Sequence, residues 1–476
     1  MRKGINLLTT FVLLILRLSA QESKPFALVD VNIVDVESGK IIRNQIAIIN
    51  KDRIADIIPL KAKPDLSGYK VIQGNENFLM PGLIDTHLHL FYYISNKKWD
   101  ELKLMFKLML ANGITGVREA GASVYTEQMI AVRDSLRKQY FPGPCIYVSG
   151  IATNSNLKKF QSKNYSELVD TFNKIGVDGI KIKFATFSET KEIIDAANRH
   201  NLIVYGHTYN NWRNETSNIL GDFTPEAVDY GIKGVMHMGF TPIGKNVLPP
   251  GPEPVYTSTS KFWEKWWLYF DALWLHTDKQ AEQKLITNMV SKKVWLEPTL
   301  STADPLMNHE KMMRKKARQY YFLPDSSLIE GFPHPTGIYL DTARMAFRKS
   351  QEFVKKFYDA GGLLLAGTDG SLYGSDLRDE LRYLVEAGIP IPAVIKIVTY
   401  NNALALGWLN EMGTVSKGKL ANLILLKKNP LLNISSLENI EAVISNGNYY
   451  NKQTLNKWLS EISIAALNEK ITKKIP

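Results

Sequence analysis

Eight short apolar runs, rich in β-forming residues, alternate with longer helix-like stretches through the middle of this chain. No other sequence feature constrains the fold as strongly. The runs are residues 83–90, 116–121, 145–150, 180–185, 202–208, 234–239, 294–300 and 363–370. Strands that alternate with helices pair in parallel, and eight of them close into a barrel. The sequence therefore predicts an α/β fold, a (β/α)8 barrel of the TIM type, with its active site at the carboxyl ends of the strands.

The two ends of the chain share a different pattern. Residues 26–60 alternate apolar and polar side chains between turn-forming clusters, and the same alternation returns in residues 419–426 and 442–450. Alternation with a period of two predicts short antiparallel strands, so we expect both ends to form one small β-sandwich module. We expect its N-terminal segment over residues 21–78 and its C-terminal segment over 409–450, with the barrel (79–408) between them and a C-terminal tail (451–476) after them.

The first twenty residues have the order of charges and apolar residues that is typical of a signal peptide. Arg2 and Lys3 precede an apolar run over residues 7–15, and small residues follow at 19–20. A membrane anchor is the alternative, but a run this short, closed by Arg17, cannot cross a hydrocarbon core that needs ~20 residues. We expect cleavage near residue 20, export to the periplasm or the outside of the cell, and no stable membrane anchor afterwards.

Composition excludes several kinds of site and partner. Cys145 is the single cysteine, so neither an intrachain disulfide nor a cysteine-based zinc site can form. The net charge of +11 is spread along the chain rather than concentrated in one segment. This distribution indicates a solvated basic surface, and no nucleic-acid-binding motif accompanies it. We expect a small-molecule substrate and no nucleic-acid partner; a homo-oligomer is compatible with the sequence.

An insertion at about residues 240–290 separates the sixth run from the seventh. It begins with prolines and continues with tryptophans. These residues are Pro249, Pro250, Pro252, Pro254, Trp263, Trp266, Trp267 and Trp274. A long insertion on the catalytic side of a barrel predicts a lid whose aromatic side chains line a pocket. The alternative, that the tryptophans pack an added helix, is equally compatible with the sequence.

Four of the eight histidines fall in or at the ends of predicted strands. His87 and His89 are two residues apart, so an extended strand directs both toward the barrel interior. His207 ends the fifth run and His237 lies in the sixth. A single histidine at such a place is usually a hydrogen-bonded structural residue, but four at one rim favour a divalent metal ion bound by neutral imidazoles. We expect the others, His200, His276, His309 and His334, on the surface.

Two further residues have side chains suited to the same site. Asp369 ends the eighth run, where its carboxylate can ligate a metal ion and accept a proton; the alternative role is a helix N-cap. Lys181 lies within the fourth run, where a buried ammonium needs neutralisation. A modified lysine that acts as an anionic ligand would explain its position. Lys183 points to the same face, so periodicity does not choose between the two lysines.

These residues belong to longer motifs spread over nearly the whole chain after residue 78. The motifs are 79–89 (Leu-Met-Pro-Gly-Leu-Ile-Asp-Thr-His-Leu-His), 179–182 (Gly-Ile-Lys-Ile), His207, His237, 366–369 (Ala-Gly-Thr-Asp), 384–388 (Leu-Val-Glu-Ala-Gly), 413–415 (Gly-Thr-Val) and 418–423 (Gly-Lys-Leu-Ala-Asn-Leu). The set resembles the amidohydrolase superfamily, especially its imidazolonepropionase-like and Xaa-Pro dipeptidase-like branch.

The resemblance implies a binuclear centre with two divalent metal ions, usually zinc. His87, His89 and Asp369 would hold one ion, His207 and His237 the other, and a carboxylated Lys181 would bridge them. In that family a metal-bridging hydroxide attacks an amide, peptide or lactam bond, and Asp369 would be the catalytic residue that passes the proton to the leaving nitrogen. The expected substrate is dipeptide-like or an N-acyl amino acid.

Two alternatives and several departures accompany this resemblance. A mononuclear deaminase of the same fold would carry a glutamate shortly after its third histidine, where this chain has His207-Thr208-Tyr209-Asn210. A non-catalytic small-molecule-binding homologue is the second alternative, since residues 151–156 lack the glycine- and histidine-rich loop of related dipeptidases. Tyr209 is a candidate for substrate binding or for packing. Arg378 stands where a histidine is frequent, and Asn422 where an aspartate is common.

Overall fold

A computed structural model describes residues 25–183, 185–210, 221–239, 274–303, 307–308, 338–370 and 374–474 of the chain. The predicted signal peptide and residues 240–273 of the predicted insertion lie outside these ranges. Among the described residues, no helix is both long and apolar enough to span a membrane.

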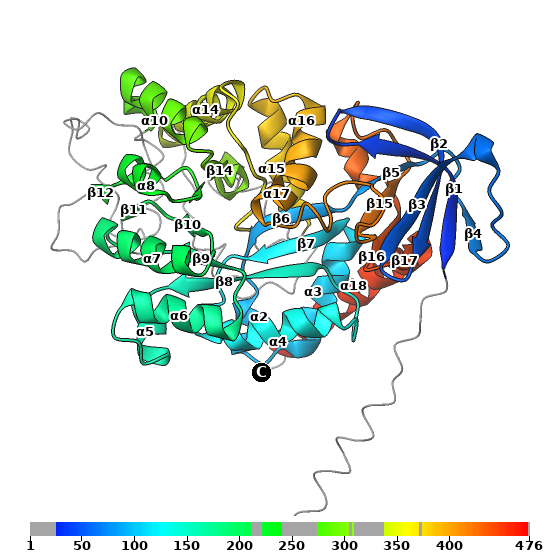
Figure 1. Cartoon of the computed structure of the whole chain (residues 1–476), viewed down its shortest axis with the longest axis horizontal. Coiled ribbons are helices and arrows are strands. Elements are labelled where there is room, and N and C mark those ends of the chain that lie inside the picture. The colour runs from blue at the N-terminus through cyan, green and yellow to red at the C-terminus, as the bar shows by residue number, and fades with distance from the viewer. Residues whose placement is uncertain are drawn as a thin grey trace, which may run out of the picture.

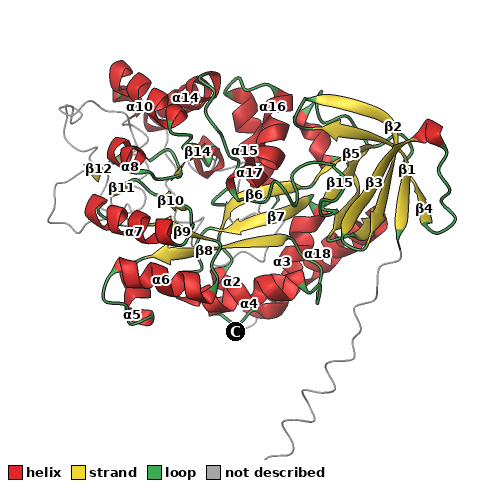
Figure 2. Ribbon diagram, viewed as in Figure 1, coloured by secondary structure: helices red, strands yellow, loops and turns green. Residues whose placement is uncertain are grey.

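The middle of the chain forms a parallel barrel of seven strands and one closing segment (Figure 2). The strands, in spatial order, are β6 (Leu83–Leu88), β7 (Ile114–Glu119), β8 (Cys145–Ala152), β9 (Gly179–Ile182), β10 (Val204–Gly206), β13 (Gly234–Met236) and β14 (Trp295–Glu297). The eighth predicted run joins both edges of this sheet. Leu365 donates its amide to Leu296 of β14 at 2.9 Å, and Thr86 of β6 donates to Ala366 at 3.2 Å. The predicted TIM-type architecture is confirmed.

Helices surround the barrel (Figure 1). They are α2 (Phe91–Ser95), α3 (Trp99–Ala111), α4 (Thr126–Arg137), α5 (Asn154–Lys159), α6 (Tyr165–Ile175), α7 (Phe187–Arg199), α8 (Thr224–Tyr230), α10 (Lys279–Ser291), α14 (Ile338–Asp359), α15 (Ser375–Glu386), α16 (Ile391–Lys396) and α17 (Asn402–Ala405). Local sequence fixes several of their ends. Thr186 and Glu189 form a reciprocal capping box at the start of α7, and Gly176, with a φ of 87°, ends α6 in the left-handed conformation.

The two ends of the chain form one eight-stranded sheet beside the barrel (Figure 1). Its strands are β1 (Phe26–Asp35), β2 (Lys40–Asn50), β3 (Arg53–Pro59), β4 (Lys70–Gln73), β5 (Phe78–Pro81), β15 (Leu423–Leu426), β16 (Ile440–Ser445) and β17 (Asn448–Asn451). Strand β5 joins the ends, because it pairs with β1 on one side and with β15 on the other. Leu28, Leu79 and Leu423 share one buried cluster. This confirms that the chain ends build a common β-module.

The C-terminal tail forms a helix, α18 (Lys452–Lys474), that packs against α3. Leu455, Trp458 and Ile462 of this helix are buried, and Lys107 of α3 forms an ion pair with Glu461 at 2.9 Å. Apolar residues three to four apart thus attach the tail to the barrel.

Trp274 is the one tryptophan of the predicted insertion that lies within the described residues. It is buried, its indole N–H donates to the carbonyl of Met238 at 2.9 Å, and its ring packs against Phe353 of α14. At this position the aromatic side chain packs against α14, a helix outside the predicted insertion, so neither alternative for the insertion is decided. Trp263, Trp266 and Trp267 lie outside the described residues, so the lid stays a prediction for that segment.

Candidate metal centre

His87, His89 and Asp369 meet at the mouth of the barrel. Strand β6 carries His87 and ends one residue before His89, while Asp369 ends the closing segment. Asp369 Oδ1 lies 3.1 Å from His89 Nε2 and 3.5 Å from His87 Nε2. One ligand atom from each of these three residues lies within 4.8 Å of the other two. Within the described ranges, this is the compact group of side chains that can hold a metal ion.

Asp85 holds together, through hydrogen bonds, the two segments that carry these three residues. Its Oδ1 accepts the amides of His87 at 3.0 Å and Thr368 at 3.1 Å, while its Oδ2 accepts the Thr368 hydroxyl at 2.9 Å. The amide of Asp369 also donates to the His87 carbonyl at 2.7 Å. Burial raises the pKa of Asp85 to about 7. Sequence reasoning missed this role, although a charged residue inside an apolar run was visible.

His237 and His207 extend the group across the barrel mouth. The His237 ring centroid lies 4.7 Å from that of His87 and 4.7 Å from that of His207. His237 Nε2 is 3.8 Å from Asp369 Oδ2, and its Nδ1 contacts Thr299 Oγ1 at 2.8 Å. Burial lowers the pKa of His237 to about 3 and that of His207 well below its usual range. Both imidazoles are therefore neutral near pH 7, the form that binds metal ions.

Lys181 points into the same space from β9. It is 1% exposed, and its Nζ lies 3.0 Å from His87 Nε2. Burial is the main cause that lowers its pKa to about 7, and the Lys183 charge adds to it. Periodicity left the two lysines equivalent, whereas the structure buries Lys181 at the site and leaves Lys183 half-buried at the strand end.

Two buried glutamates stand behind the histidine pair, and sequence reasoning did not single them out. Glu297, the last residue of β14, has its Oε1 2.7 Å from His87 Nδ1. Glu119, the last residue of β7, has its Oε1 3.7 Å from His89 Nδ1 and accepts the amides of Leu90 and Gly121. The signal that could have identified them is a charged residue at the end of a strand that is predicted to be buried.

The remaining candidates lie elsewhere or outside the described residues. Tyr209 belongs to β11 (Tyr209–Asn210), which pairs with β12 (Gly221–Asp222), but its side chain is not among those described, so substrate binding stays a prediction. His200 pairs with Asp170 at 2.7 Å on the outside of the barrel. His309 and His334 lie outside the described residues.

The donor set fits a divalent metal ion. The Glu297 carboxylate can only accept a hydrogen bond, so His87 Nδ1 carries the ring proton and the lone pair on Nε2 faces the site. Imidazole nitrogens and a carboxylate oxygen are the ligands that zinc takes in proteins without cysteine, and a carboxylate behind a ligating histidine is a common second partner.

A comparison with known protein families identifies the family of this chain. The sequence model of the amidohydrolase family matches residues 78–449, which include the barrel and the strands β5, β15 and β16 of the terminal sheet. The chain belongs to the amidohydrolase family. The match also covers all six predicted metal ligands of this amidohydrolase. A search of the curated proteins finds no significant sequence match.

Solved structures share the amidohydrolase's fold. A prolidase from Bifidobacterium longum superposes with a TM-score of 0.63 at 21% identity, covering 92% of this chain and 99% of that one. A Xaa-Pro dipeptidase with bound methionine gives 0.63 at 20% identity, with 90% and 100% covered. The ochratoxinase of A. niger gives 0.63 at 16% identity, with 92% and 98% covered. At these identities the similarity shows a shared fold.

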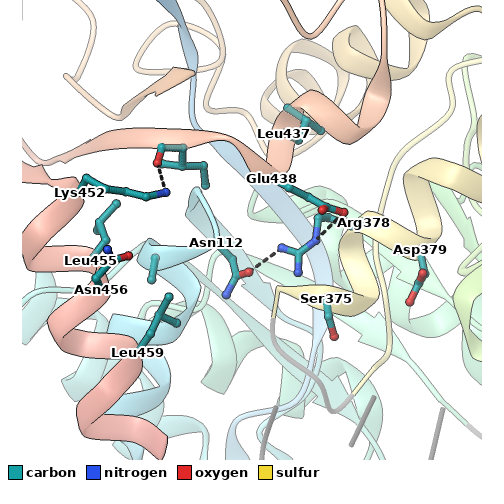
Figure 3. Close-up of a pocket in the computed structure, with 12 residues that line it drawn as sticks. Asn112, Ser375, Arg378, Asp379, Leu437, Glu438, Lys452, Leu455, Asn456 and Leu459 are labelled. Atoms are coloured by element: carbon teal, nitrogen blue, oxygen red, sulfur yellow. Dashed lines mark hydrogen bonds and ion pairs between the residues drawn. The ribbon is translucent and has the colours of Figure 1, made fainter. Parts of the chain in front are cut away.

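A separate cavity of about 300 Å³ lies between α3, α15, α18 and the short helix η7 (Ile434–Glu438) (Figure 3). Its cations already have partners, because Arg378 donates to Asn112 Oδ1 at 2.5 Å and Lys452 donates to the Ile440 carbonyl at 2.5 Å. None of the six predicted ligands lines it. In this amidohydrolase Arg378 therefore binds the C-terminal end of α3 and does not contribute to the candidate metal centre.

Proposed function

We propose that this amidohydrolase is an exported, metal-dependent enzyme that hydrolyses an amide, peptide or lactam bond in a dipeptide-like or N-acylated amino-acid substrate. The observation that carries the proposal is the position of Lys181, which is fully buried with its Nζ 3.0 Å from His87 Nε2 and beside the group of His87, His89 and Asp369. The activities named for two structural neighbours, a prolidase and a Xaa-Pro dipeptidase, support the substrate class.

Lys181 favours a centre with two metal ions over a centre with one. A single ion held by His87, His89 and Asp369 needs no lysine, and an unmodified ammonium beside a ring nitrogen that must bind metal competes with the ion. Carboxylation converts the ammonium into an anionic group with two oxygens, which removes this competition. We therefore propose that the metal would be zinc, that His207 and His237 would hold the second ion, and that a carboxylated Lys181 would be a ligand shared by both ions.

The residues of the chain divide the reaction between them. Bound divalent ions supply Lewis acidity, which lowers the pKa of water and polarises a substrate carbonyl. The Asp369 carboxylate, whose pKa neighbouring His87 and His89 hold well below its usual range despite burial, takes one proton from the attacking water. As the C–N bond breaks, Asp369 returns this proton to the leaving nitrogen, so the products are an amine and a carboxylic acid, which then ionises in water.

Metal content and turnover test this proposal together. The full chain is stripped with a chelator, reloaded with zinc or manganese in bicarbonate, and assayed on dipeptide and N-acyl amino-acid libraries. We expect close to two ions per chain, turnover that the chelator abolishes, and loss of both in Lys181→Ala. Lys103→Ala, which removes an exposed lysine paired with Asp100, is the control. Less than one ion per wild-type chain, with no turnover of either library, contradicts the proposal and favours a binding protein.

A further inference from the structure

An ion pair lies inside the barrel directly behind the candidate metal centre. Arg118 of β7 and Glu297 of β14 are both fully buried. Arg118 Nη2 donates to Glu297 Oε2 at 2.5 Å, and Arg118 Nε donates to the Thr86 carbonyl at 2.6 Å. The other oxygen of Glu297 faces His87 Nδ1 at 2.7 Å. The three side chains therefore form one continuous chain of hydrogen bonds that ends on a predicted metal ligand.

Stability alone does not account for this ion pair. The Arg118 guanidinium lies 4.3 Å from the Tyr205 ring centroid and 5.1 Å from that of Trp295, within an otherwise apolar cluster. Within the described residues, its Nη1 has no hydrogen-bond partner. Well-packed apolar residues in place of a buried ion pair are often equally stable or more stable. A role beyond packing is therefore the better explanation.

The hydrogen-bond pattern fixes the ring state of His87. Arg118 can only donate, so the atom of residue 297 that faces it must accept. The carboxylate of Glu297 then presents its second acceptor to His87, which places the ring proton on Nδ1 and leaves the lone pair on Nε2. That lone pair faces Lys181 Nζ at 3.0 Å and Asp369 Oδ1 at 3.5 Å.

We propose that Arg118 is a positioning residue that acts through Glu297 to hold His87 in its metal-binding tautomer. The effect on metal affinity rests on the proposed function, whereas the effect on the tautomer does not require a metal ion. His89 provides an internal contrast. The carboxylate behind it, Glu119, accepts the backbone amides of Leu90 and Gly121 and lies 3.7 Å from His89 Nδ1.

Glu297→Gln tests this directly, because glutamine has nearly the same shape as glutamate but replaces one acceptor oxygen with an NH2 donor. Its amide oxygen must face Arg118, so its NH2 group faces His87 Nδ1 and moves the ring proton to Nε2. We expect zinc affinity, measured by competition with a chromophoric chelator, to fall by about 10- to 100-fold. Adding Arg118→Met frees the glutamine to turn, so the double variant should bind zinc at least fivefold more tightly than Glu297→Gln alone.

Arg133→Met is the matched control, because Arg133 is also buried and pairs with Asp178 at 2.9 Å away from the site. We expect it to lower the melting temperature and leave zinc affinity within twofold of wild type. A double variant that binds zinc no better than Glu297→Gln alone contradicts the proposal. If the double variant does not fold, Glu297→Gln alone decides, and an unchanged zinc affinity overturns the proposal.

The tautomer of His87 can be measured without metal. Protein labelled with 15N-histidine, stripped of metal, gives long-range proton–nitrogen correlations that distinguish a proton on Nδ1 from one on Nε2. We expect Nδ1–H in the wild type and in Arg133→Met, and Nε2–H in Glu297→Gln. The same tautomer in the wild type and in Glu297→Gln overturns the positioning role. A wild type that shows the expected tautomer but binds no zinc contradicts the proposed function and leaves the positioning role supported.

Discussion

Lys181→Met should stabilise the metal-free protein while removing its ability to assemble the proposed metal centre. Methionine has a similar length but no charge, so it fills the same space in the barrel without a buried ammonium. The expected gain follows from the pKa of Lys181, which burial lowers from 10.5 to about 7. At about 1.4 kcal/mol per pKa unit, this difference corresponds to about 5 kcal/mol, the largest gain that removing the charge can give.

The pH dependence has a definite sign. Between pH 7 and pH 10.5 the unfolded chain keeps the proton on Lys181 and the folded chain has released it. Because the unfolded state then binds more protons, the free energy of unfolding of the wild type rises with pH across this window. The destabilisation is fully present below pH 7. The free energy of unfolding of Lys181→Met should therefore exceed that of the wild type most at pH 6 to 7. The two values should converge toward pH 10.

Urea unfolding in the presence of a chelator, at pH 6.5 and at pH 9.5, measures this difference. Lys103→Met is the control, because Lys103 is exposed and pairs with the exposed Asp100 at 3.1 Å, so the change should alter stability by less than about 1 kcal/mol at either pH. With zinc and bicarbonate added, the wild type should gain stability and Lys181→Met should gain much less. A variant that is less stable than the metal-free wild type at pH 6.5 would refute the reasoning about the buried ammonium.

Three other predictions test separate regions of the molecule. Asp369→Asn should lower kcat on the best library substrate by about 10²- to 10⁴-fold, since an amide cannot take the proton from water; more than a tenth of wild-type kcat would contradict this role. Trp274→Ala should cost about 3 to 5 kcal/mol in urea unfolding, because a buried indole is removed, and should leave KM unchanged; a raised KM with normal stability would instead support a pocket role. Glu380→Gln tests a buried acid whose pKa burial raises from 4.5 to about 8. The folded state keeps that proton up to pH 8, whereas the unfolded state loses it near pH 4.5, so the free energy of unfolding of the wild type falls between these pH values. The free energy of unfolding of the variant, relative to that of the wild type, should therefore be higher at pH 8.5 than at pH 5. The same stability difference between variant and wild type at pH 5 and at pH 8.5 would contradict the raised pKa of Glu380.

The periodic features of the sequence predicted the fold well. Alternating β-rich runs and helical stretches gave the barrel, and the alternation at both ends gave the shared β-module, because both patterns depend on which side chains face the core. The eighth run makes one ladder contact, Leu296 with Leu364, and closes the barrel mainly through single hydrogen bonds. Such irregular closure depends on the geometry of both neighbouring strands, which no local pattern contains.

The candidate site was only partly predicted. His87, His89 and Asp369 lie together as their positions at strand ends suggested, since the carboxyl ends of parallel strands meet at one rim. The side chains behind them were not predicted. Glu297 and Arg118 come from strands that are far apart in sequence, and their pairing depends on barrel closure. Periodicity did not distinguish Lys181 from Lys183; the family resemblance singled out Lys181, and the structure buries its side chain at the site.

The candidate site contains backbone conformations and buried ionisable side chains that are unfavourable for stability. His237, Thr299 and Asp369 have positive φ values of 63°, 47° and 46°, although none is glycine. His237 and Thr299 lie just beyond the ends of β13 and β14, and Asp369 ends the closing segment. Non-glycine residues in this region cost roughly 1 to 3 kcal/mol each, and such outliers cluster at functional sites. Together with the buried ionisable side chains of Asp85, Arg118, Glu119, Lys181 and Glu297, they indicate that this barrel mouth is shaped for binding and chemistry at the expense of stability.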